Sequence, residues 1–175
     1  MMKRLFFLLL LSLTALLLPA CDLLPPPVES DGSLVPDAPQ FPELPGERGE
    51  VVEVIDGDTI EVRIDGRTVP VRYIGIDTPE RDEPCYDEAA AANAAYVAGR
   101  TVRLVRDTSD TDRYDRLLRY VYVDDLLINA ELVAGGWAES RRYRPDDALY
   151  DFLEGLERTA VAEQRGCHPF GSFPP

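Results

Sequence analysis

Residues 51–80 read VVEVIDGDTIEVRIDGRTVPVRYIGIDTPE and contain three segments of strand character separated by short turns. Residues 59–65 alternate apolar and charged side chains, as a strand with one buried face does. Asp65-Gly66 is a strong hairpin signal that leads into a third strand over 67–75. Pro70 has no amide proton for a ladder, so it predicts an edge position or a bulge. The stretch therefore predicts a sheet that begins with three consecutive strands.

The rest of the domain carries one helix signal, two strand signals and two further helix signals. An alanine-rich segment predicts the first helix, and an apolar stripe at helical spacing predicts the last one. We expect the last helix to begin near Pro145, because proline and acids suit a first turn. This pattern is typical of a mainly β, α+β domain. The predicted strands cover 51–56, 59–65, 67–75, 101–106 and 117–124, and the predicted helices cover 86–97, 128–134 and about 145–166.

Two of the turns place acidic side chains where strands end. Asp58 and Asp77 could share one hard cation, which prefers oxygen ligands. Arg72 lies just before the second turn and Glu80 just after it. A metal, a base and a guanidinium are the components that phosphoryl-transfer chemistry needs. Either turn alone is explained as well by ordinary turn chemistry, but the two turns together with Arg72 indicate a functional site.

At this point the sequence resembles a known family. The run from Asp56 to Glu80 resembles the signature of the staphylococcal nuclease (thermonuclease) family, and Asp112-Arg113-Tyr114-Asp115-Arg116 is similar to its Asp-Lys-Tyr-Gly-Arg motif. Residues 129–138 resemble the short helix that follows. The motifs occur in the family's order, at nearly its spacings, across about residues 51–168. The resemblance implies a five-stranded OB-type β-barrel with three helices, with oligonucleotide lying across one face.

The resemblance also implies a metal site. Asp58, Asp77 and the backbone carbonyl of Thr78 would hold a calcium ion that keeps open positions for water and a phosphate oxygen. Asp56 alternates with Asp58, and we expect it to support the turn or to reach the ion through water. We do not count it as a direct ligand.

The same resemblance implies the catalytic residues. Arg72 and Arg116 would clamp the scissile phosphate and stabilise the charge that it gains in the transition state. Glu80 would activate the attacking water as a general base, or orient it. From residue type alone, each of the three could equally be a solvated surface charge. The family motifs favour the catalytic interpretation.

Three further residues are implied as substrate-binding. Arg113 would contact a terminal phosphate, and Tyr114 and Tyr143 would offer stacking faces to the nucleotide. The loop from Glu80 to Tyr86 departs from the family, because it is shorter than in the best-known member and is acidic. Substrate preference is therefore not carried over from the family.

The overall charge is unfavourable for non-specific nucleic-acid binding. The chain of 175 residues carries a formal charge of −14, whereas such binding normally depends on basic surface. A locally basic site with a divalent cation remains compatible with this charge. After residue 4 every basic residue is arginine, which suits bidentate phosphate recognition but also fits a GC-rich genome.

The N-terminal segment predicts export. Residues 1–20 comprise a basic start and a fourteen-residue apolar stretch, too short for an ordinary spanning helix. Leu18-Pro19-Ala20-Cys21 resembles a bacterial lipobox, so cleavage would leave Cys21 lipid-modified. A plain secretory signal is the alternative. We expect a cell-envelope lipoprotein on a Pro-rich disordered tether over 21–50, or else a secreted protein.

The remaining cysteines suggest a disulfide. Setting Cys21 aside leaves Cys85 and Cys167, and an even pair in an exported protein is most simply bonded. Two independent buried thiols are the alternative. The predicted organisation is then a domain over 51–168 and a C-terminal tail over 169–175.

Together these observations predict an exported, membrane-tethered, calcium-dependent nuclease that acts on DNA, RNA or both. By resemblance, the 5′-oxygen would leave and the products would carry 3′-phosphates. A catalytically weak or inactive domain that binds nucleic acid or protein is the alternative. A purely structural lipoprotein would leave the two carboxylate turns and Arg116 unexplained. We expect a monomer.

Overall fold

The structure is a computed structural model that describes residues 33–35, 37–39 and 46–173. The predicted signal peptide, Cys21 and most of the predicted tether lie outside the described residues. Within the described part, no helix has both the length and the apolar character needed to cross a membrane.

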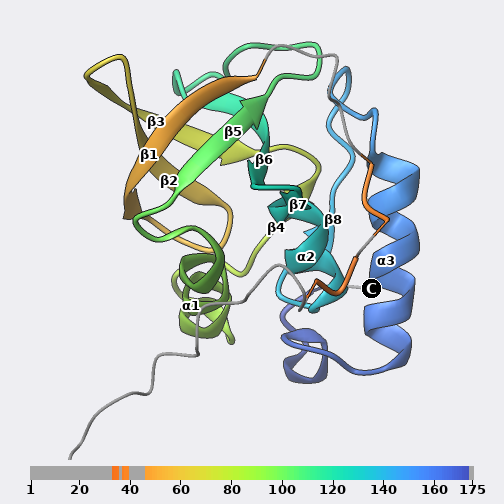
Figure 1. Ribbon diagram of the computed structural model, residues 1–175. Helices are drawn as coiled ribbons and strands as arrows, with labels where there is room; N and C mark the ends of the chain where they lie inside the picture. The colour runs from red at the N-terminus through yellow and green to blue at the C-terminus, as the bar shows by residue number, and fades with distance from the viewer. Residues whose placement is uncertain (1–32, 36, 40–45, 174–175) are drawn as a thin grey trace, which may run out of the picture.

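A closed barrel of five strands forms the centre of the domain (Figure 1). The strands lie side by side in the order β3-β2-β1-β5-β6, and β3 pairs with β6 to close the barrel. The closing pair is parallel, and the other four pairs are antiparallel. The predicted barrel is therefore confirmed, as a mixed sheet. The strands are β1 (Glu47–Val54), β2 (Thr59–Ile64), β3 (Arg67–Tyr73), β5 (Thr101–Val105) and β6 (Leu117–Val123).

Three helices lie at one end of the barrel, with α2 between α1 and α3 (Figure 1). Two short strands, β4 and β8, pair with each other beside the helices, and β7 extends the sheet from β6. The helices are α1 (Tyr86–Val97), α2 (Ile128–Ala134) and α3 (Tyr150–Ala162), followed by a short 3-10 helix over His168–Phe170. The short strands are β4 (Ile76–Asp77), β7 (Leu126–Leu127) and β8 (Glu139–Ser140).

The β2–β3 hairpin forms where the sequence predicts it. Asp65 and Gly66 both adopt positive φ, 48° and 80°, which is the conformation that a two-residue turn between twisted strands requires. Pro70 pairs opposite Glu61 in the β2 ladder, and the β3 ladder with β6 begins only at Val71. The proline therefore lies where β3 has a free edge, as its missing amide proton demands.

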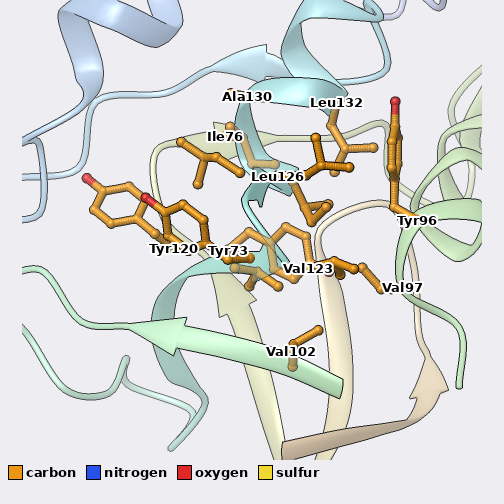
Figure 2. Close-up of a cluster of buried hydrophobic side chains, with 14 of the residues drawn as sticks. Tyr73, Ile76, Tyr96, Val97, Val102, Tyr120, Val123, Leu126, Ala130 and Leu132 are labelled. Carbon is orange, nitrogen blue, oxygen red and sulfur yellow. The ribbon is translucent and has the colours of Figure 1, made fainter. Parts of the chain in front are cut away.

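The core fills the barrel and the space between it and the helices (Figure 2). Tyr73, Tyr120 and Tyr122 are almost completely buried within it, and Leu132 of α2 and Leu153 of α3 are fully buried. Each large apolar side chain removed from water contributes about 1.5–3 kcal/mol to folding. These contacts explain why the helices stay fixed to the end of the barrel.

The last helix begins later than the sequence predicts, at Tyr150 instead of near Pro145. The acid that we expected in its first turn, Asp146, is buried and accepts hydrogen bonds from the amides of Thr108 and Ser109, at 3.0 and 2.6 Å. A carboxylate that accepts hydrogen bonds from the amides of another loop is not available to the amides of the first helical turn. The segment before Tyr150 is therefore a packed turn.

Part of the predicted tether is packed against the domain. The carboxylate of Glu131 in α2 is completely buried and accepts hydrogen bonds from the Ser33 hydroxyl and from the amides of Leu34 and Val35. Val35 is itself buried in the core. A buried carboxylate needs such donors, so these three residues contact the domain although they lie in the segment over 21–50 predicted as a disordered tether. The barrel also starts earlier than predicted, at Glu47.

Cys85 and Cys167 form the disulfide that the sequence predicts, across a separation of 82 residues. We expect the Cys85→Ser/Cys167→Ser double variant to lose about 2–4 kcal/mol of unfolding free energy, because the bridge restricts the unfolded chain. Urea denaturation of the variant and of the oxidised wild type measures this loss. Reduced wild type should match the variant, and equal midpoints for all three would contradict the prediction.

Candidate active site

The two carboxylate turns meet directly in the structure. Asp58 lies in the turn between β1 and β2, and its Oδ2 accepts hydrogen bonds from the amide and the hydroxyl of Thr78, both at 3.0 Å. Gly57 permits this approach, since a Cβ there would lie 2.8 Å from Thr78 side-chain atoms. A residue with a side chain at position 57 would push the turns apart. Close packing against Thr78 therefore requires glycine at position 57, in addition to any preference of the turn.

Arg72 joins the two aspartates. Its Nε lies 3.0 Å from Asp58 Oδ1, and its Nη2 lies 2.7 Å from Asp77 Oδ1. Nη1 donates to the carbonyl oxygens of Tyr73 and Ile76, at 2.6 and 2.8 Å. Its hydrogen bonds engage both N–H groups of Nη1 and one of Nη2, while Nε makes an ion-pair contact with Asp58, so one N–H of Nη2 is left without a hydrogen bond among the residues that the structure describes. Arg72 is first of all the group that holds the site together.

Two buried asparagines fix the backbone around this cluster. Asn93 of α1 donates to the carbonyl oxygen of Asp56 at 2.9 Å and accepts from the Tyr73 hydroxyl at 2.9 Å. Asn129 of α2 donates to the carbonyl oxygen of Ile74 at 2.8 Å. Because both asparagines are completely buried, these hydrogen bonds are shielded from water. The helices therefore position both ends of the site.

Asp58 is an unusual carboxylate, because only 5% of its surface is exposed. Burial raises its pKa to about 6, with Asp56 and Asp77 adding to the increase, while the guanidinium of Arg72 and the Thr78 hydrogen bond lower it. Arg72 therefore compensates only part of the cost of burying this charge. A further cation beside Asp58 would favour the ionised form.

The donor set fits a calcium ion. Asp58, Asp77 and the carbonyl of Thr78 provide the oxygen donors that this hard cation prefers. Asp77 keeps 32% of its side chain exposed, so it can be reached from solvent. The hydroxyls of Thr59 and Thr78 that bind Asp58 can rotate away. Within the described residues no cluster of three or more His, Cys, Asp or Glu side chains could hold a metal, so a cation here would depend on the carbonyl and on water or substrate.

A cleft of about 570 Å³ lies next to Arg72. Its lining includes all three predicted substrate-binding residues and both predicted catalytic arginines: Arg72, Arg113, Tyr114, Arg116 and Tyr143. Tyr114 and Tyr143 expose 62% and 47% of their surfaces, and the Arg113 guanidinium lies 4.6 Å from the centre of the Tyr114 ring. The cleft therefore offers guanidinium groups and two accessible aromatic rings.

Arg116 is bound by the carboxylate of Asp112 through its Nε and its amide, which leaves its two Nη groups for other partners. Its Nε donates to Asp112 Oδ2 at 2.7 Å, and its amide donates to Asp112 Oδ1 at 3.0 Å. The two Nη groups make no hydrogen bond within the described part of the chain. Asp115 has φ of 62°, so it adopts the left-handed conformation at the place where the related motif carries glycine. Asp115 thus takes the backbone conformation that glycine adopts most easily, and it does so in a tight loop.

Glu80 lies apart from the arginine cleft. It lines a second, smaller cavity of about 180 Å³ together with Asp77, Thr78 and Glu83, and its amide donates to Glu83 at 2.7 Å. Ser172 and Phe173 form part of this cavity's wall. Asp77 pairs with Arg72 at the boundary between the two cavities. Ser172 and Phe173, in the segment predicted as a C-terminal tail, are therefore part of the site's surroundings.

Sequence reasoning missed several residues of the site. Asp112 belongs to the quoted motif, and its spacing of four from Arg116 was the signal that could have identified it. Asp146 was assigned to a helix start, although it fixes the loop that lines the cleft. Arg144, Leu118 and Ser109 also line the cleft, and nothing in their local sequence marks them.

Comparison with known proteins gives a consistent result. Residues 70–167 match the family described as staphylococcal nuclease homologue. A thermonuclease of Staphylococcus intermedius is 35% identical over 128 residues, which are 70% of this chain and 76% of the relative. Protein ParB of Escherichia coli is 40% identical over 142 residues, 76% of this chain and 77% of the relative. A micrococcal nuclease of Shigella flexneri is 34% identical over 123 residues, 63% of this chain and 70% of the relative.

Asp112 gives a pH-dependent test of the arginine loop. Burial alone would raise its pKa, but the hydrogen bonds from Arg116 and the Tyr114 amide outweigh burial and lower the pKa below its ordinary value of 3.8. A lowered pKa means that the charge stabilises the fold above pH 3.8 and that this contribution is lost as the pH falls further. We therefore expect Asp112→Asn to cost about 1 kcal/mol at pH 7 and less near pH 3.

Urea denaturation at both pH values measures the difference. Asp115→Asn is the matched control, because it removes the same charge from the same loop at an exposed position. A cost for Asp112→Asn that is the same at both pH values would show that its charge does not stabilise the loop.

Proposed function

The chain belongs to the staphylococcal nuclease family and is a nuclease-type hydrolase; we propose that it is an exported, calcium-dependent enzyme that cleaves phosphodiester bonds of DNA, RNA or both. One observation carries this proposal. The ion-paired group of Asp58, Arg72 and Asp77 borders a cleft that is also lined by Arg116, whose Nη groups make no hydrogen bond within the described residues. This arrangement suits a phosphodiester better than a neutral substrate.

The chain's own residues would divide the work between them. The Nη groups of Arg116 and the remaining Nη2 donor of Arg72 are available to a phosphate in the cleft. Fixed donors of this kind stabilise the charge that the phosphorus oxygens gain in the transition state. Tyr114 and Tyr143 would hold the adjoining nucleotide by stacking, and Arg113 would contact a further phosphate.

Calcium, held by Asp58, Asp77 and the Thr78 carbonyl, would supply Lewis-acid polarisation of a phosphate oxygen. Glu80 would accept a proton from the attacking water or orient that water, from the cavity that it shares with Asp77. We propose that the 5′-oxygen leaves and that the products carry 3′-phosphates. The exposed position of Glu80 leaves it free to move toward the water.

A binding module on the same barrel is the competing function. Its support is the acidic composition of the chain, with a formal charge of −14. The cleft argues against a protein-binding module, which has no need for two arginines in one concave site, whereas a nucleic-acid-binding module would also use them. Activity separates the two functions directly.

The first test is cleavage of single-stranded DNA, duplex DNA and RNA by the full chain with millimolar calcium or with a chelator. We expect calcium-dependent cleavage that falls by about 10²–10³ in kcat for Arg116→Ala, since one charge-stabilising donor of the transition state is removed. Arg142→Ala is the control, because this exposed arginine does not line the cleft. Cleavage that survives the chelator, or an Arg116→Ala enzyme with wild-type kcat, would refute this function.

We also propose that Cys21 carries a lipid and tethers the enzyme to the cell-envelope membrane. The support is the basic start, the short apolar stretch and the lipobox-like residues before Cys21. Cys21→Ser should remove labelling by a fatty-acid analogue and shift the protein out of the membrane fraction. A wild-type protein that carries no label and is recovered from the medium would instead indicate plain secretion.

A further inference from the structure

The loop over 106–116 presents Arg113, Tyr114 and Arg116 to the cleft, and a buried arginine lies at its base. We infer that Arg119 in β6 is a positioning residue for this loop: its guanidinium fixes Asp110, and through Asp110 it sets the place of Arg116. This inference builds on the proposed function, because it assigns a role to a residue behind the phosphate-binding group.

Arg119 is almost inaccessible, with 3% of its side chain exposed. Its Nη1 donates to the carbonyl oxygens of Asp110 and Leu118, both at 2.9 Å. Its Nη2 lies 2.8 Å from Asp110 Oδ1 and 3.2 Å from Glu47 Oε2. The backbone and the side chain of Asp110 are thus both bound by one rigid fork, a geometry that lysine cannot reproduce.

The contacts continue from Asp110 to the catalytic arginine. The Asp110 carbonyl also accepts the amide of Leu118 at 2.9 Å, and Thr111 forms a bridge with Leu117. Asp112, two residues beyond Asp110, accepts the Nε of Arg116 at 2.7 Å. A shift of Asp110 would therefore move Asp112 and with it the Nη groups of Arg116. Displacements of about 1 Å in such groups can cost 10²-fold in rate.

The second carboxylate on Arg119 provides a matched control. Glu47 lies at the start of β1 and is outside the loop. Both acids are similarly exposed, with 51% of the Glu47 side chain and 58% of the Asp110 side chain accessible. Asp110 also lies 3.9 Å from Arg106, an exposed pair of the kind that contributes little. Removing either acid leaves Arg119 with one carboxylate partner, but of the two acids only Asp110 belongs to the loop that lines the cleft.

The experiment compares Asp110→Asn with Glu47→Gln in the full chain, using calcium-dependent cleavage of one oligonucleotide. We expect Asp110→Asn to lower kcat about tenfold or more, while Glu47→Gln stays within about twofold of wild type. Arg119→Lys keeps the charge and loses the fork, so it should behave as Asp110→Asn does. Urea midpoints of all three variants separate loss of activity from loss of folded protein. Equal kcat values for Asp110→Asn and Glu47→Gln would overturn the inference.

Amide hydrogen exchange of peptides that cover 110–117 provides a readout independent of catalysis. Faster exchange there in Asp110→Asn than in Glu47→Gln supports a fixed loop, and identical exchange contradicts it. If the wild type cleaves and the two variants are indistinguishable, the inference fails while the proposed function stands. If the wild type does not cleave, the proposed function fails, and exchange alone decides whether Arg119 fixes the loop.

Discussion

The parallel pairing of β3 with β6 is the constraint on which the site depends. It sets Arg72 opposite Leu118 and Tyr73 opposite Arg119. Arg116 directly precedes β6, so the same pairing brings the two catalytic candidates to one side of the barrel although they are distant in sequence. A sheet left open at this seam would keep all its antiparallel pairs, and the cleft would still be lost. The pairing that closes the barrel therefore also brings Arg72 and Arg116 to the same cleft.

The sequence predicts the strands and the residue types of the site better than it predicts which distant residues contact them in the fold. The alternation in 59–65 and the Asp65-Gly66 turn are local signals, and the structure contains both. Arg72 and Asp77 are five residues apart, and the geometry of one turn brings them into contact. Contacts between residues this close in sequence can be predicted from local patterns, because a short turn leaves the chain few ways to keep them apart.

Long-range partners could not be predicted in this way. Arg119 binds Glu47, 72 residues earlier, and Glu131 binds Ser33, 98 residues earlier. Neither pair has a local pattern, since charged residues in strands and helices are usually solvated. The same reason explains the late start of α3, because Asp146, which we expected in its first turn, binds a distant loop instead. Glu80 was predicted from the family motif, yet its amide binds the Glu83 carboxylate and it lines a separate cavity.

The acidic composition of the chain does not by itself exclude phosphate binding, because the acids of the cleft are paired with donors of the protein. Around the cleft, Asp112 is occupied by the Nε of Arg116 and two backbone amides. Asp146 is buried and occupied by the amides of Thr108 and Ser109. Both acids accept hydrogen bonds from donors within the loops, while the Nη groups of Arg116 make no hydrogen bond in the part of the chain that the structure describes. The charged residues that line the cleft are Arg72, Arg113, Arg116 and Arg144 against Asp112 and Asp146. Their sum is positive, so a strongly negative chain can still present a locally positive site.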